Sequence, residues 1–208
     1  MKKLLIIAIA AAFCSISQAT TITASSIPQM SYQYGYEWGI NLGSGVQLAS
    51  ASITLNATVA NTTQGYLFIS LLDTTPVSGI TSTSGNTEAS PATDFWASQV
   101  TGNNSAGKPK YVSIATLHYG TSWGSGNNDG KTITINITGN ALTDLNSYLS
   151  TSPRGFNIGF DPDCIYNFSS LSFTYTTRSV VPDTASTVFL LGAGLLGLEI
   201  FRRKFALA

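Results

Sequence analysis

Apolar side chains fall on every second residue in several short runs of this chain. Such a period of two places one row of side chains in a core and the other in water, as in a half-buried β-strand. The run 66–72 is more continuously apolar and fits a central strand. The alternating runs are 51–59, 131–138, 155–160 and 171–175. A further strand-like run covers 111–117.

Polar turn clusters separate these runs, as at 102–104, 124–130 and 161–163. Glycine, proline and asparagine favour turns. Six or more short strands with such spacing predict an all-β fold, an antiparallel β-sandwich of jelly-roll type. The unperiodic stretch 76–91 predicts a long loop.

One segment has helical spacing instead. Leu142, Leu145 and Leu149 recur at intervals of three and four residues. Asn140 is a good N-cap residue, and Pro153 is a stop signal. We expect one short helix over 140–149 that crosses one end of the sandwich.

The N-terminus has the three parts of a secretory signal peptide. Lys2 and Lys3 precede an apolar run, and small residues at Ser17 and Ala19 follow it. The run is about half the length of a membrane-spanning helix, and we predict cleavage after Ala19. A lipoprotein signal ending at Cys14 is disfavoured because the bulky Phe13 precedes that cysteine.

Composition limits the possible functions of the remaining ectodomain, residues 20–179. Only 10% of the chain is charged, against about a quarter in an average protein. Acidic residues outnumber basic ones between the two ends, so we expect no nucleic-acid partner. Cys164 is the one cysteine left after signal removal, which excludes an internal disulfide.

The C-terminal segment, residues 180–208, changes character. An apolar run of about 14 residues would form a helix of roughly 21 Å, shorter than the ~30 Å hydrocarbon core. The basic cluster Arg202, Arg203 and Lys204 follows, and such residues favour the cytoplasmic side of a membrane. The segment is thus a marginal transmembrane helix, and an ordinary tail anchor is the alternative.

Val181, Pro182 and Asp183, followed by the apolar run and the basic cluster, resemble a PEP-CTERM sorting signal of the Val-Pro-Asp-Ser-Gly variant. Thr184 and Ala185 depart from the Ser-Gly of that variant. The resemblance implies processing by an exosortase, a membrane transpeptidase, in a Gram-negative bacterium. It also implies transient anchoring in the inner membrane, then delivery to the cell surface or an exopolysaccharide matrix. The stretch 156–164 resembles uncharacterised proteins of the same class.

Aromatic residues offer a possible sugar site. Tyr32, Tyr34, Tyr36 and Trp38 stand at every second position and would share one face of a strand. Pyranose rings could stack on such a platform, whereas the alternative is that the rings pack in the core. Further candidate sugar contacts are Trp96 and Trp123.

Asp161 and Asp163 flank a proline and could contribute to a Ca²⁺ site, although Ca²⁺ needs six to eight oxygen ligands. Asp-Pro-Asp is equally suited to a turn. We expect no other cofactor and no catalytic residues.

The expected function is a non-enzymatic surface or matrix protein with a structural or adhesive role. A carbohydrate-binding module is the alternative. A polysaccharide hydrolase is a third, since it would need only a pair of carboxylates.

Overall fold

The computed structural model describes residues 18–43, 45–60, 65–85, 94–120, 127–151 and 155–178. The predicted signal sequence up to residue 17, Trp123 and the whole C-terminal segment from residue 179 lie outside these ranges. The transmembrane helix and the basic cluster predicted there therefore stay predictions.

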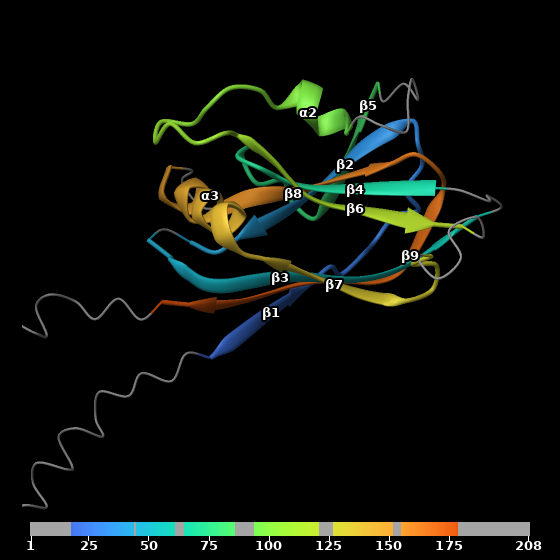
Figure 1. Ribbon diagram of the computed structural model, residues 1–208, viewed down its shortest axis with the longest axis horizontal. Helices are drawn as coiled ribbons and strands as arrows, with labels where there is room; N and C mark the ends of the chain where they lie inside the picture. The colour runs from blue at the N-terminus through green and yellow to red at the C-terminus, as the bar shows by residue number, and fades with distance from the viewer. Residues whose placement is uncertain are drawn as a thin grey trace, which may run out of the picture. The chain divides into compact units, whose positions relative to one another are not determined.

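The described strands form two sheets with antiparallel pairing throughout. The four-stranded sheet has the order β1 (Ala19–Thr23), β9 (Tyr166–Thr177), β3 (Leu48–Val59) and β7 (Thr132–Ile137). The five-stranded sheet has the order β5 (Ile80–Ser84), β2 (Tyr34–Asn41), β8 (Gly155–Pro162), β4 (Gly65–Leu72) and β6 (Tyr111–Tyr119). The predicted all-β, two-sheet antiparallel architecture is confirmed, and Figure 1 shows the two layers.

Alternation along each strand produces the core between the sheets. In β3, Ile53 and Leu55 are buried while Thr54 between them is half-buried on the other side. Ile53 lies opposite Phe173 of β9, and Trp38 of β2 lies opposite Ile158 of β8. One continuous cluster of buried residues contains members of both sheets. Consecutive strands β1 to β4 alternate between the two sheets.

The predicted helix is present as α3 (Gly139–Thr151) and lies at one end of the two layers (Figure 1). Leu145 and Leu149 are buried, as their spacing predicted. Asn146 fixes the helix to β3, because its side chain accepts a hydrogen bond from Leu48 N at 2.7 Å and donates to Leu48 O at 3.1 Å.

Two elements correct the sequence expectations. The stretch 76–91 was predicted to be a loop, but it contains β5, which pairs with the edge of β2. A second helix, α2 (Phe95–Gln99), packs on the outside of the five-stranded sheet (Figure 1).

Glycines in β2 and β8 let other segments lie directly on the outer face of the five-stranded sheet. A Cβ at Gly159 would come within 2.8 Å of Trp96 in α2. At Gly39, a Cβ would come within 1.9 Å of the backbone oxygen of Val77. Asn157 secures the same loop, because its side chain accepts from Val77 N at 3.0 Å and donates to Thr75 O at 2.9 Å.

Candidate functional sites

The predicted row of four aromatic rings does not form one exposed platform. Tyr32 lies in a turn before β2, and Tyr34 begins the strand with 36% of its surface exposed. Tyr36 and Trp38 point into the core and are 5% and 3% exposed. The alternative interpretation, core packing, therefore applies to Tyr36 and Trp38, and Tyr34, at 36%, is the most exposed of the four residues.

Trp96 is also buried, with 3% of its surface exposed. Its ring covers Gly159, and its Nε1 donates a hydrogen bond to Phe160 O at 3.2 Å. The ring therefore holds α2 on the sheet and is not exposed to a sugar. Trp123 lies outside the described residues.

Asp161 and Asp163 hold backbone amides. Asp161 lies within β8, not in the predicted turn, and its Oδ2 accepts from Phe95 N at 2.6 Å. Asp163 Oδ1 accepts from Tyr66 N at 2.5 Å and from the Tyr166 hydroxyl at 3.3 Å. Burial raises the pKa of Asp163, and the hydrogen bond from the Tyr66 amide opposes part of that rise.

Through these contacts, Asp161 holds the start of α2 and Asp163 holds the start of β4. Within the described ranges, no three His, Cys, Asp or Glu side chains gather as a metal site would require. In the described part of the chain, no further acidic, histidine or cysteine side chain joins Asp161 and Asp163 to form such a group, whereas Ca²⁺ takes six or more oxygen ligands.

A buried polar cluster at the start of α2 was missed by the sequence analysis. Asp94 is the N-cap of α2, and its Oδ1 accepts from Trp96 N at 2.9 Å. Its Oδ2 accepts from the Ser70 hydroxyl and, at 3.0 Å, from the Tyr111 hydroxyl. Burial, with the nearby Asp94 charge, raises the pKa of Tyr111. The signal in the sequence is Asp94, a residue type that favours the N-cap position, but the helix after it is too short to show a helical period.

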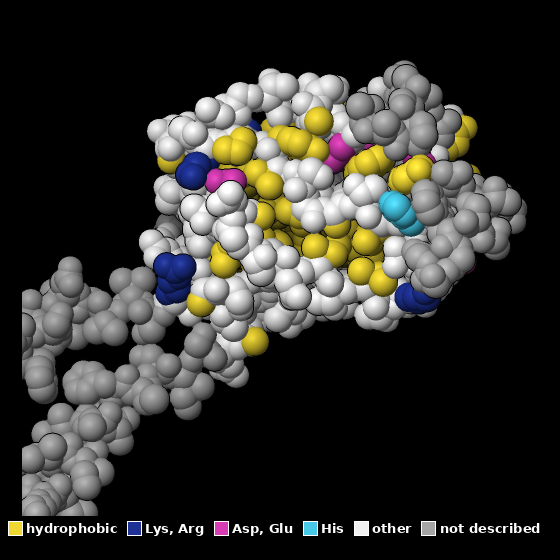
Figure 2. Space-filling view, in the orientation of Figure 1, with side chains coloured by type: hydrophobic (Ala, Val, Ile, Leu, Met, Phe, Trp, Pro, Cys, Tyr) yellow, Lys and Arg dark blue, Asp and Glu magenta, His cyan; other side chains and the backbone are white. Residues whose placement is uncertain are grey.

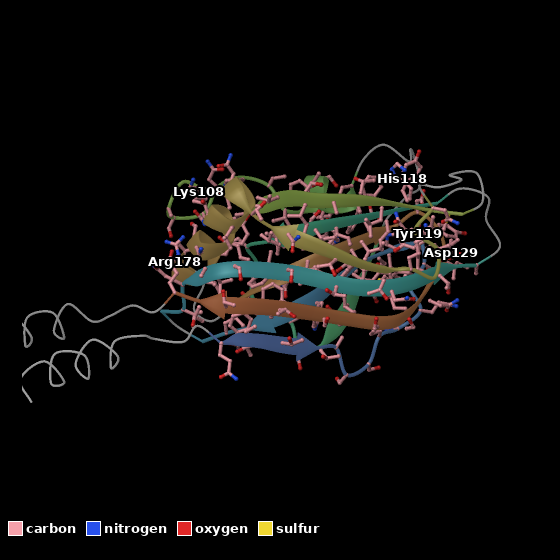
Figure 3. All side chains as sticks on the ribbon, turned by 60° about the horizontal axis from the view of Figure 1, so that its bottom comes forward. Lys108, His118, Tyr119, Asp129 and Arg178 are labelled. Carbon is pink, nitrogen blue, oxygen red and sulfur yellow. The ribbon has the colours of Figure 1, made fainter. Side chains whose placement is uncertain are left out.

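His118, the one histidine of the chain, lies at the end of the two sheets opposite Arg178 (Figure 3), and Cys164 is the one cysteine among the described residues. In β6, His118 is paired with Tyr66, and their rings contact edge to face at 5.3 Å. Gly65 directly precedes Tyr66 in β4, and a Cβ added at Gly65 would come within 3.2 Å of Cys164 Sγ. Because successive residues of a strand face opposite sides, His118 and Cys164 lie on opposite faces of the sheet. This arrangement does not make them a nucleophile and base pair.

Tyr119 adds a buried hydroxyl at the same end (Figure 3). Its ring packs edge to face against Tyr166 at 5.1 Å. Among the described residues, its Oη is the one buried side-chain polar atom without a hydrogen-bond partner. Burial and the charge of Asp129 raise the pKa of Tyr119, so the hydroxyl stays protonated at neutral pH.

The comparison with protein families concerns the C-terminal segment. A family model described as the VPDSG-CTERM motif matches residues 180–205. These residues are a VPDSG-CTERM sorting signal. The VPDSG-CTERM match covers Val181, Pro182 and Asp183 and reaches the basic cluster ending at Lys204, so the resemblance inferred from these residues is confirmed despite Thr184 and Ala185.

The VPDSG-CTERM signal is the feature that marks the chain as an exported protein handled by a sorting system. No curated protein has significant similarity to the chain. Among the helices of the described ranges, none has the length and hydropathy needed to span a bilayer.

Proposed function

We propose that this chain is a surface or extracellular-matrix protein of a Gram-negative bacterium with a structural or adhesive role. We propose further that an exosortase-like membrane transpeptidase processes it near the motif and releases it from transient anchoring in the inner membrane. The observation that carries the proposal is the VPDSG-CTERM signal at residues 180–205, placed directly after a β-sandwich.

The position of the signal supports removal without damage to the fold. The last strand, β9, ends at Thr177, and the matched motif begins three residues later. β9 is already held on both sides by β1 and β3. Loss of the segment after the motif therefore removes none of the described strands.

The roles of the described carboxylates also support a structural protein. Asp94, Asp161 and Asp163 each accept a hydrogen bond from a backbone amide. Such bonds fix the positions of α2 and of the β8–β9 turn. These contacts support the proposed structural role.

The test is the mass of the mature C-terminus of protein recovered from the cell surface or the matrix. We expect a chain that ends near Val181 to Asp183 and lacks the residues beyond. Surface-located protein that retains Arg202, Arg203 and Lys204 would contradict processing. A Pro182→Ala variant should accumulate uncut in the inner membrane, while Thr187→Ala, outside the Val-Pro-Asp motif, should be processed normally.

A carbohydrate-binding module is the second candidate, and the exposed ring of Tyr34 favours it. Tyr34→Ala should then abolish glycan-array binding, while Gln33→Ala, exposed in the turn before β2, controls for general changes near the strand. An array without signal for the parent protein would count against this candidate.

A further inference from the structure

The two sheets differ in how their two sides are closed. On one side, the segment 24–33 joins β1 to β2, and its Met30 is fully buried. Met30 pairs with Tyr166 of β9 through two backbone hydrogen bonds of 3.0 and 2.8 Å. On the other side, β6 and β7 are the last strands of their sheets and lie side by side (Figure 1). No described strand pairs with the free edge of either one.

Apolar side chains of β6 and β7 line the opening between the layers. Ile135 of β7 is paired with Ile53 of β3, which is buried. Leu117 of β6 is paired with Leu67 of β4, which is also buried. Ile135 and Leu117 therefore point between the sheets, yet both are only half-buried. Figure 2 shows hydrophobic side chains gathered in the hollow between the two layers. We call this surface the apolar seam and define it by Ile114, Ala115, Leu117, Ile133 and Ile135.

The apolar seam differs from a surface that water satisfies. Contact between apolar side chains and water is unfavourable, and a contiguous apolar patch marks an interaction site. Free strand edges also carry unpaired backbone groups, and charged side chains in such strands usually prevent pairing. β6 and β7 contain no Asp, Glu, Lys or Arg, although Lys110 and Lys131 stand directly before them. Both the side chains and the strand edges are therefore suited to a protein partner.

We infer that a second copy of this chain covers the apolar seam and forms a two-fold dimer. A two-fold axis perpendicular to the sheets places β7 antiparallel to β7 of the other copy, and the same axis brings the two seams together. Because these strands are antiparallel, the two Lys131 side chains lie at opposite ends of the pair. A bulge opposite Ile69 and Ser70 interrupts the regular edge of β6. β7 therefore forms the strand pairing, and β6 contributes apolar side chains.

The dimensions of the opening favour a second copy over a single inserted strand. Packed sheets are about 10 Å apart and a strand is about 4.8 Å wide, so one inserted strand would leave part of the seam in water. β6 has nine residues and is about 30 Å long. A strip of about 30 by 20 Å buries about 600 Å² on each copy, or about 1,200 Å² in total, which reaches the range of specific interfaces. The inference goes beyond the proposed function, because neither sorting nor adhesion requires a dimer.

The experiment compares two lysine variants of the exported protein purified from the cell surface. Thr134→Lys adds a charge at an exposed position in the middle of β7, outside the core. Near the two-fold axis, the two added lysines lie close together and repel each other. Thr83→Lys adds the same charge at an exposed position of β5, the edge strand on the other side of the five-stranded sheet.

Sedimentation velocity over a range of concentrations measures the dissociation constant of the dimer, and urea unfolding checks that both variants fold. Hydrogen exchange of the parent protein at low and high concentration locates the amides that dimerisation protects. The parent protein should form a dimer with a dissociation constant of about 1–100 μM, as expected for an interface at the small end of the specific range. Thr134→Lys should raise this constant at least about fivefold, whereas Thr83→Lys should leave it unchanged.

The protection that appears with concentration should lie in β6 and β7. A parent protein that stays monomeric at the highest of these concentrations would overturn the inference. So would equal effects of the two variants, or concentration-dependent protection that lies outside β6 and β7. A different polypeptide bound in equal amount to each copy would overturn it as well, because the seam would then have another occupant.

Discussion

Asp94 joins three parts of the fold through one side chain. It caps α2 and accepts hydrogen bonds from Ser70 of β4 and Tyr111 of β6. Asp94→Ala removes the cap and leaves two hydroxyls without this acceptor, so we expect the free energy of unfolding to fall by about 2–4 kcal/mol. Urea unfolding measures it.

Gln99→Ala is the matched control for Asp94→Ala. Gln99 is exposed near the end of the same helix, where it bonds only to the neighbouring Ser98 in the described contacts. We expect a change within about 0.5 kcal/mol. Equal effects of the two substitutions would show that Asp94 has no special role.

Glu37 gives the fold a pH dependence with a defined sign. Burial raises its pKa above the ordinary value of 4.5, and the hydrogen bond from the Thr74 hydroxyl opposes part of that rise. The folded protein therefore holds the proton more tightly than the unfolded chain. The stability that the protonated Glu37 carboxyl contributes is fully present below pH 4.5, and it is lost as the pH rises through the pKa that Glu37 has in the folded protein.

The glutamine in Glu37→Gln cannot ionise, so the variant does not lose stability in this way as the pH rises. We expect the stability of the variant relative to the parent to increase between about pH 3.5 and pH 7. Comparison with the parent cancels the contribution of Asp163, whose pKa burial raises in the same direction. Thermal unfolding at several pH values measures the difference, and a constant difference would contradict the assignment.

At the level of elements, glycine in β2 allows the contact with the loop that carries Val77. Gly39→Ala would place a Cβ 1.9 Å from a backbone oxygen, so the loop must move. We expect a loss of about 2–3 kcal/mol in the free energy of unfolding, as for other overpacked sites. Thr83→Ala, exposed on neighbouring β5, should change it by less than about 0.5 kcal/mol. Chemical unfolding measures the free energy of unfolding of both variants, and equal values would contradict a tight contact at Gly39.

Strands with many inward apolar residues could be predicted: β3, β4, β6, β8 and β9 contain the predicted runs, and β7 lies within the predicted run 131–138. β5 was missed because Ile80 is its one apolar residue, and its pairing with β2 depends on a distant segment. α2 was missed because its five residues show no period.

The candidate sites were less predictable than the strands. Period two in β2 correctly grouped Tyr36 and Trp38 on one face, but it does not say which face is buried. Asp161 was assigned to a turn because Pro162 follows, yet the proline ends a strand whose outer face α2 covers. Burial on both faces is set by tertiary packing, which local patterns do not contain.

At the scale of the whole molecule, the sorting segment should be separable from the fold. A chain that starts at Thr20 and stops after Arg178 keeps every described strand except the first residue of β1. We expect its free energy of unfolding to match that of a chain covering 20–208 within about 0.5 kcal/mol.

A stop after Ser170 is the contrasting truncation. It removes Leu171 and Phe173, which are buried between the sheets, and the pairing that holds β1. We expect this chain not to fold, as judged by circular dichroism and urea unfolding. A cooperative transition in the shorter chain, or its loss in the longer one, would contradict this division.

The central place of β9 also has a mechanical consequence. A load that reaches the protein through its C-terminus enters the fold at Thr177, the last residue of a strand paired on both sides. Tension along that strand strains both hydrogen-bond ladders together in shear, so they cannot unzip one bond at a time. A load applied through the edge strand β1 would instead be borne by its single ladder with β9.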